Sequence, residues 1–257
     1  MADVSSANVV GYSTVTVKAG WLNLISAQFD AVGENARPAL NDGFVSGEIF
    51  GTDQYSYDDA DMIMVYMPSL GGYHSDYKFY WSVDESDPSY NNVWLCTTDD
   101  EPTDYVLPAD KSFFYWCRND HDVTLTFAGA VKAEPVSAEI TGNYLNMVAN
   151  PYPAEIVLNG ANRSFAWETL GVKGSDQYSY DEADMIMLYV PTLGGYHSDY
   201  KFYWSIDESD SAYNNVWLCT TDDEPTTQTI PAGAGFWYWR RGAENITLPF
   251  ASPIADK

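Results

Sequence analysis

The sequence predicts an all-β protein built as two tandem homologous domains, each a β-sandwich or a β-barrel. Two observations predict this. At an offset of 123 residues, segment 51–103 aligns without a gap with 174–226, and 45 of the 53 positions are identical. Short β-branched and aromatic runs alternate with turn residues, and no apolar stripe of helical period is sustained over ten positions. A repeat of this length indicates two copies of one fold.

The repeat divides the 257 residues into a first domain over 9–132 and a second over 133–255. The division falls at Ala133-Glu134-Pro135. Each copy has about 123 residues, which is enough chain to build its own hydrophobic core. We therefore expect two similar β-domains whose most alike segments present one surface twice.

Each element of the first copy follows from a run of strand-forming residues bounded by Gly, Pro, Asn or Asp. The expected strands are 9–17, 22–26, 62–67, 77–83, 93–97, 105–107, 112–117 and 123–127. The composition of 30–55 is mixed, so a short helix and a long loop both remain open there.

Alternation along a strand predicts which aromatic residues lie in the core. In 77–83, Phe79 and Trp81 share one face, while Lys78 and Tyr80 share the other. We expect six aromatic side chains to be mostly buried, namely Phe79, Trp81, Trp94, Phe202, Trp204 and Trp217.

The charge is strongly acidic, with 37 acidic and 12 basic residues, a net charge of −25 and a pI of about 4.1. Binding of nucleic acid requires clustered Lys and Arg, so a nucleic-acid partner is excluded. No apolar run approaches the roughly 20 residues of a transmembrane helix. The sequence predicts no transmembrane segment.

The chain begins Met1-Ala2-Asp3-Val4, without the basic and apolar regions of a signal peptide. An exported protein whose leader has been replaced by Met would look the same, and the acidic, aromatic-rich composition favours a secreted or cell-surface protein. Cys96, Cys117 and Cys219 form no disulfide framework, because Cys117 aligns with Arg240 in the second copy. We interpret all three as free or packed thiols.

Two motifs resemble a loose group of uncharacterised exported bacterial tandem β-domains. One is Ala19-Gly20-Trp21-Leu22-Asn23-Leu24-Ile25-Ser26, which is similar to a Gly-Trp-Asn-Leu-Ile-Ser opening strand. The other is Pro231-Ala232-Gly233-Ala234-Gly235-Phe236-Trp237, a Pro-Ala-Gly-x-Gly-Phe-Trp strand. The resemblance implies export and a non-catalytic role, and the first copy departs from it at Asp110-Lys111-Ser112.

Catalysis is not expected, although carboxylates are abundant. Acid–base chemistry needs two carboxyl groups in unlike environments, and these acids lie in turns where full ionisation is the default. No nucleophile motif surrounds His74 or its equivalent His197. Both histidines are expected to be turn residues that hydrogen-bond a neighbouring Asp.

Two acidic loops are candidates for calcium, which prefers several oxygen ligands on a flexible loop. An ordinary solvated loop remains the alternative, because the order of the acids matches no strict calcium motif. The candidate ligands are Asp84, Glu85, Asp87, Asn91 and Asn92, with Asp207, Glu208, Asp210, Asn214 and Asn215 in the second copy.

The tyrosines of the repeat predict a binding or assembly surface. Its candidate residues are Tyr55, Tyr57, Tyr73, Tyr80 and Tyr90, with Tyr178, Tyr180, Tyr196, Tyr203 and Tyr213. Two identical aromatic patches can bond head to tail with further copies, which favours a self-assembling structural protein forming a filament, sheet or coat. The alternative is a secreted carbohydrate-binding module with two equivalent sites.

Overall fold

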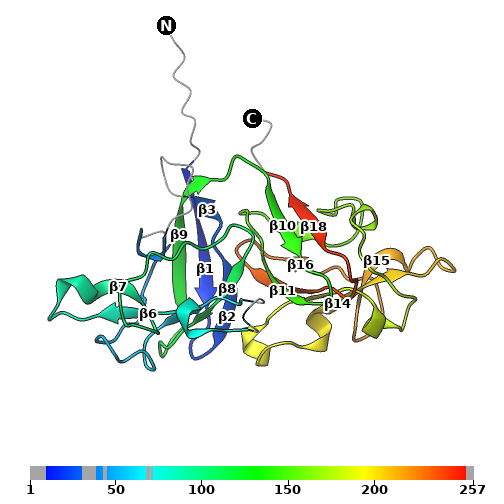
Figure 1. Ribbon diagram of the computed structural model, residues 1–257. Coiled ribbons are helices and arrows are strands. Elements are labelled where there is room, and N and C mark those ends of the chain that lie inside the picture. The colour runs from blue at the N-terminus through cyan, green and yellow to red at the C-terminus, as the bar shows by residue number, and fades with distance from the viewer. Residues whose placement is uncertain (1–9, 31–38, 43–44, 68–69, 71, 253–257) are drawn as a thin grey trace, which may run out of the picture.

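The computed structural model describes residues 10–30, 39–42, 45–67, 70 and 72–252. It is all-β, and helix among these residues is limited to single 3-10 turns. Figure 1 shows the first half (10–132) and the second half (133–252) side by side, with β7 and β15 at opposite ends of the molecule. The outer limits of the expected domains, residues 9 and 253–255, lie outside the described residues.

The first half consists of two antiparallel sheets. The larger has the order β2 (Leu22–Ser26), β8 (Ser112–Trp116), β5 (Met62–Met64), β6 (Lys78–Val83) and β7 (Asn91–Cys96). In the smaller, β9 (Val123–Val131) pairs with β1 (Val10–Val17), β3 (Phe29–Asp30) and β4 (Val45–Ser46). Single 3-10 turns cover Leu40–Asp42, Ser75–Tyr77 and Pro88–Tyr90.

The second half repeats the larger sheet in the same order. Its strands are β11 (Leu145–Ala149), β17 (Gly235–Trp239), β13 (Met185–Met187), β14 (Lys201–Ile206) and β15 (Asn214–Cys219). Two short ribbons accompany it, β10 (Val136–Ile140) with β18 (Ile246–Phe250) and β12 (Ile156–Val157) with β16 (Thr229–Ile230). Its 3-10 turns are Trp167–Thr169, Tyr180–Glu182, Pro191–Leu193 and Ser198–Tyr200.

Each core lies between the inner face of the larger sheet and the accompanying strands. The alternation in β6 places Phe79 and Trp81 toward this core, as expected. Five of the six aromatic residues predicted to be core are at most 1% exposed, and Trp81 is half-buried. In the first half, the packing of two sheets around one core corresponds to the sandwich alternative.

The outer faces of the two larger sheets pack against each other and join the halves. This interface is rich in methionine, with Met62 and Met64 from β5 and Met185 and Met187 from β13. Two equivalent backbone hydrogen bonds flank it: Ser26 N donates to Gly233 O at 2.9 Å, and Ala149 N donates to Asp110 O at 3.0 Å. Met fills irregular gaps well, so it suits a contact between two curved sheets.

The offset of 123 does not hold throughout. The Asn41 side chain donates to Trp94 O and accepts from Trp94 N, at the edge strand β7. Asn159 makes the same two bonds with the backbone of Trp217. Asn41 and Asn159 are thus equivalent, although they are 118 residues apart. The offset returns to 123 at Phe50 and Lys173, which bond equivalent aspartates. Between 13–50 and 136–173, the two copies therefore do not keep one register in the central part.

The extra residues in the second half have a packing role. The segment between Asn159 and Lys173 is five residues longer than its counterpart between Asn41 and Phe50. It brings Phe165 and Trp167 into the core, where the ring centroids of Trp167 and Trp217 are 5.1 Å apart. In the first half, the described residues of 30–55 include the end of β3, the strand β4 and the 3-10 turn Leu40–Asp42, while 31–38 and 43–44, where the sequence leaves a short helix or a long loop open, lie outside the described residues.

Several strand limits also differ. No strand covers 105–107, where Val106 makes a single bridge to Ala39, and β5 ends at Met64. Residue 9, expected to begin the first strand, is outside the described residues. No helix in the described part of the chain is long and apolar enough to cross a membrane.

Candidate functional site

A groove lies on the outer face of each larger sheet, beside the methionine interface. In the first half, strand register sets Met64 opposite Lys78 and Met62 opposite Trp116, so these four side chains share one face. They line a groove of about 310 Å³. Its other walls come from Ser75, Thr97 and the loop that carries Tyr57 and Asp58.

The second half has a groove of about 340 Å³ built from the same residue types. Every lining residue of one groove has its counterpart at an offset of 123 in the other. The second set is Tyr180, Asp181, Met185, Met187, Ser198, Lys201, Thr220, Trp239 and Arg241. The molecule therefore carries one site twice.

An arginine stacks on a tryptophan in each groove. The guanidinium carbon of Arg118 lies 3.5 Å from the centroid of the Trp116 ring, and Arg241 repeats this distance on Trp239. The ring's negative face attracts the cation and fixes its position. The Nε of each arginine is buried without a hydrogen-bond partner, so both guanidinium groups keep unused donors.

A buried aspartate holds the end of the strand that carries this pair. The Asp61 carboxylate is fully buried and accepts hydrogen bonds from the backbone N of Phe50 and Arg118 and from the Tyr115 hydroxyl, at 2.9, 2.5 and 2.6 Å. Burial raises the pKa of Asp61, although these three bonds oppose the rise. The backbone of the groove arginine is thus tied to the core.

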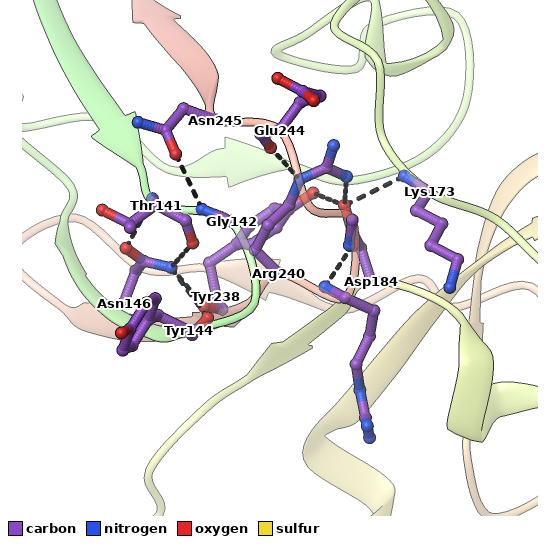
Figure 2. A network of polar contacts seen from close by, with 12 residues as sticks. Thr141, Gly142, Tyr144, Asn146, Lys173, Asp184, Tyr238, Arg240, Glu244 and Asn245 are labelled. Atoms are coloured by element: carbon purple, nitrogen blue, oxygen red, sulfur yellow. Dashed lines mark hydrogen bonds and ion pairs between the residues drawn. The ribbon is translucent and has the colours of Figure 1, made fainter.

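Asp184 is the equivalent of Asp61 in the second half, and it also forms an ion pair with a buried arginine, Arg240. Figure 2 shows Asp184 bonded by the Lys173 backbone, the Tyr238 hydroxyl and the Arg240 guanidinium, the last at 2.5 Å. Both ionised side chains are at most 5% exposed. Arg240 replaces the buried Cys117 of the first half, so only the second carboxylate has a buried counter-charge.

The loop beside each groove, which carries Tyr55 and Tyr57 in the first half and Tyr178 and Tyr180 in the second, is strained. We call it the tyrosine loop. Tyr55 and Tyr178 have φ of 73° and 72°, a region that bulky residues rarely adopt, and their side chains are 71% and 70% exposed. The Tyr80 hydroxyl accepts from Tyr55 N at 3.1 Å and donates to Asp100 at 2.8 Å, which holds the loop in this conformation. The equivalent bonds recur around Tyr203.

The ten predicted surface tyrosines do not form one surface. Tyr80 and Tyr203 are fully buried, because the face of β6 and β14 that carries them is covered by the tyrosine loop, and their inclusion in an exposed surface is wrong. Tyr73 and Tyr196 pack against the aromatic rings of the interface. Tyr90 and Tyr213 bond Glu101 and Glu224. Tyr55, Tyr57, Tyr178 and Tyr180 are exposed on the loops, and Tyr73 and Tyr196 are also 38% and 39% exposed despite their packing against the interface.

The acidic loops use their carboxylates to order themselves. Asp84 accepts from the backbone and hydroxyl of Ser86, and Asp87 caps the 3-10 turn that follows it. The bonds of Asp207 and Asp210 are equivalent. Asn91 and Asn92 begin β7, as Asn214 and Asn215 begin β15, while Glu85 and Glu208 are exposed. Within the described ranges, no three His, Cys, Asp or Glu side chains gather to hold a metal ion.

His74 and His197 are turn residues, as predicted. Each ring Nδ1 accepts the backbone N–H of the Asp two residues later, at 3.4 Å. Sequence reasoning missed the groove cations. Among the 12 basic residues, only Lys78 with Lys201 and Arg118 with Arg241 recur at the offset of 123, and that recurrence could have identified them.

Comparison of the chain with known protein families, with curated proteins and with solved structures finds no match.

Proposed function

We propose that the protein is a secreted, non-catalytic carbohydrate-binding module with two equivalent sites, one groove in each half. The observation that supports this proposal is the recurrence of the full groove lining at an offset of 123. Each groove sets aromatic rings beside hydroxyl, carboxylate and cationic groups. Sugars present both apolar C–H faces and hydroxyls, so they match such a mixed lining.

A binding role also agrees with the carboxylates present. Among the described residues lining each groove, the single carboxylate is Asp58 in one and Asp181 in the other. Most glycosidases act with two carboxyl groups flanking the bond that is cleaved. One exposed carboxylate can accept hydrogen bonds from sugar hydroxyls without supplying that pair.

Isothermal titration with short oligosaccharides tests the proposal through its stoichiometry. We expect two molecules bound per chain. Tyr57→Ala and Tyr180→Ala should each leave one site, and the double variant should leave none. Tyr12→Ala is the matched control, because Tyr12 is 76% exposed on β1 and lines neither groove. Binding retained by the double variant would contradict the proposal.

Self-assembly is a second candidate, and the strained loops favour it. Tyr55 and Tyr178 hold an unfavourable backbone conformation while exposing their rings to solvent. Such strain costs about 1–3 kcal/mol and is typical of functional positions. Two exposed, rigid tyrosines at equivalent places could each contact another copy and extend a polymer.

Sedimentation velocity tests this second candidate. The runs compare the natural chain with the variant Tyr55→Ser, Tyr178→Ser at low salt, with EDTA and with millimolar calcium. Molecules that each carry a charge of −25 repel one another, so assembly should require salt or divalent cations and should be lost in the variant. A natural chain that stays monomeric in every condition rules out this candidate.

A further inference from the structure

The cations of the two grooves differ from most of the other basic residues that the structure describes. Of the six described basic side chains outside the grooves, Lys173 has no ion pair with a described residue and five form one, namely Lys18, Lys111, Lys132, Arg163 and Arg240. Within the described structure, the groove cations Lys78, Arg118, Lys201 and Arg241 make no ion pair with an acidic residue. A chain with 37 acidic residues thus holds none of these four side chains in an ion pair, although Arg118 lies close enough to Asp61 to oppose the rise in the pKa of that carboxyl.

The arrangement holds each arginine ready to bind. Tryptophan stacking fixes one face of the guanidinium, and the bond from Arg118 N to Asp61 fixes the backbone behind it. Stacking alone does not satisfy the N–H donors, which lie around the edge of the planar group. Within the described structure, neither guanidinium donates a hydrogen bond, and Nε is the part of each that is buried. An acceptor in the groove that bound the accessible Nη groups would supply bonds that the protein itself does not.

We propose that each groove binds an acidic saccharide, with the sugar's anionic group on Arg118 and Lys78 in the first half and on Arg241 and Lys201 in the second. This inference rests on the proposed function and specifies its substrate class. Among the side chains that line each groove, two are positive and one is a carboxylate, on a protein whose net charge is −25. Charge-assisted bonds to a carboxylate or sulfate are stronger than neutral ones.

The remaining groups of the groove fit the rest of such a sugar. Asp58, Ser75 and Thr97 also line the groove and supply oxygens for the sugar's hydroxyls. Asp58 would repel a second anionic group nearby, so a saccharide with charges spaced one per sugar residue suits the groove better than a densely charged one. The exposed Tyr57 ring offers an apolar surface to the sugar's C–H face.

Titration with two tetrasaccharides that differ only in charge tests the inference. The probes are tetragalacturonate and its fully methyl-esterified, neutral form, at about 0.15 M salt so that the long-range repulsion of the acidic protein is screened. We expect the charged form to bind at two sites, at least tenfold more tightly than the ester. A tetrasaccharide that carries sulfate esters and no carboxylate distinguishes a sulfate ligand from a carboxylate.

Variants assign the charge to its residues. Lys78→Gln with Arg118→Gln should weaken tetragalacturonate at one site at least tenfold and leave the ester unaffected. Lys18→Gln is the matched control, because it removes a cation outside the grooves and should change nothing. Thermal unfolding of each variant confirms that it is folded.

Each outcome has a distinct meaning. If the ester binds as tightly as the acid, the grooves bind saccharides but the inference of an anionic ligand is wrong. If neither charged nor neutral saccharide binds, the proposed function fails together with the inference. Binding of tetragalacturonate that survives in a variant with all four groove cations changed to Gln overturns the inference directly.

Discussion

Removing the carboxylate of Asp184 should destabilise the protein far more than removing the equivalent Asp61. Both carboxylates are fully buried and accept backbone and tyrosine hydrogen bonds, so the hydrogen bonds lost are similar. Asp184 differs in accepting one longer backbone bond, from Gly242 N at 3.3 Å, and above all in its pairing with Arg240, which is 4% exposed. Asp184→Ala therefore leaves a buried guanidinium without its counter-charge.

The expected magnitudes follow from this difference. Stranding one partner of a buried ion pair costs about 3–5 kcal/mol. That cost comes in addition to the donors left without an acceptor, each at about 1–3 kcal/mol, which Asp61→Ala and Asp184→Ala have in common. Asp61→Ala also removes a carboxylate whose burial is unfavourable. For a chain of 150–250 residues, 1 kcal/mol corresponds to about 2–4 °C in Tm.

A double-mutant cycle makes the test sharper. The first half serves as the reference, because it has Cys117 at the position where the second half has the buried cation Arg240. Arg240→Cys installs the residue found at Cys117. Thermal unfolding followed by tryptophan fluorescence would compare Asp184→Ala, Arg240→Cys and the double variant. We expect the double variant to lose about 1–3 kcal/mol less than the sum of the single losses. Strict additivity, or an Asp61→Ala loss as large as that of Asp184→Ala, would refute the reasoning.

Three further predictions concern single side chains. The pKa of Asp61 is raised in the folded state, so the folded form binds a proton at this carboxyl more readily than the unfolded form. Relative to Asp61→Asn, the natural chain should therefore gain stability as the pH falls from 7 toward 4. A difference in Tm between the two proteins that does not change with pH would contradict this. Trp204→Ala should lower the free energy of unfolding, measured by urea denaturation, by about 3–5 kcal/mol. Trp81→Ala should lower it less, because the Trp81 ring is half-buried. Equal losses in the two variants would contradict this. Burial raises the pKa of the Cys117 thiol. Iodoacetamide at pH 8 should therefore modify the half-buried Cys96 in the native protein and spare Cys117, as mass spectrometry of the digested chain would show. Labelling of Cys117 in the native protein as fast as that of Cys96 would show that the core is open there.

The sequence alone determined the all-β class and most strands of the larger sheets. These strands carry strong local information, because alternation assigned Phe79 to the core and Lys78 to the outer face before any contact was known. The same alternation put Tyr80 on the outer face, but it could not tell that the tyrosine loop covers that ring. Which part of an outer face is covered depends on distant chain segments.

Only the tertiary structure decided the candidate site. Trp116 and Arg118 lie about 40 residues from Lys78, outside the segment where the two copies are most alike, and pairing of β8, β5 and β6 brings them to one groove. The five-residue shift at Asn41 and Asn159 was equally invisible, because each asparagine is recognised by its bonds to an edge strand and by no local pattern. Local sequence sets the side a residue faces, whereas non-local strand pairing sets which residues become neighbours.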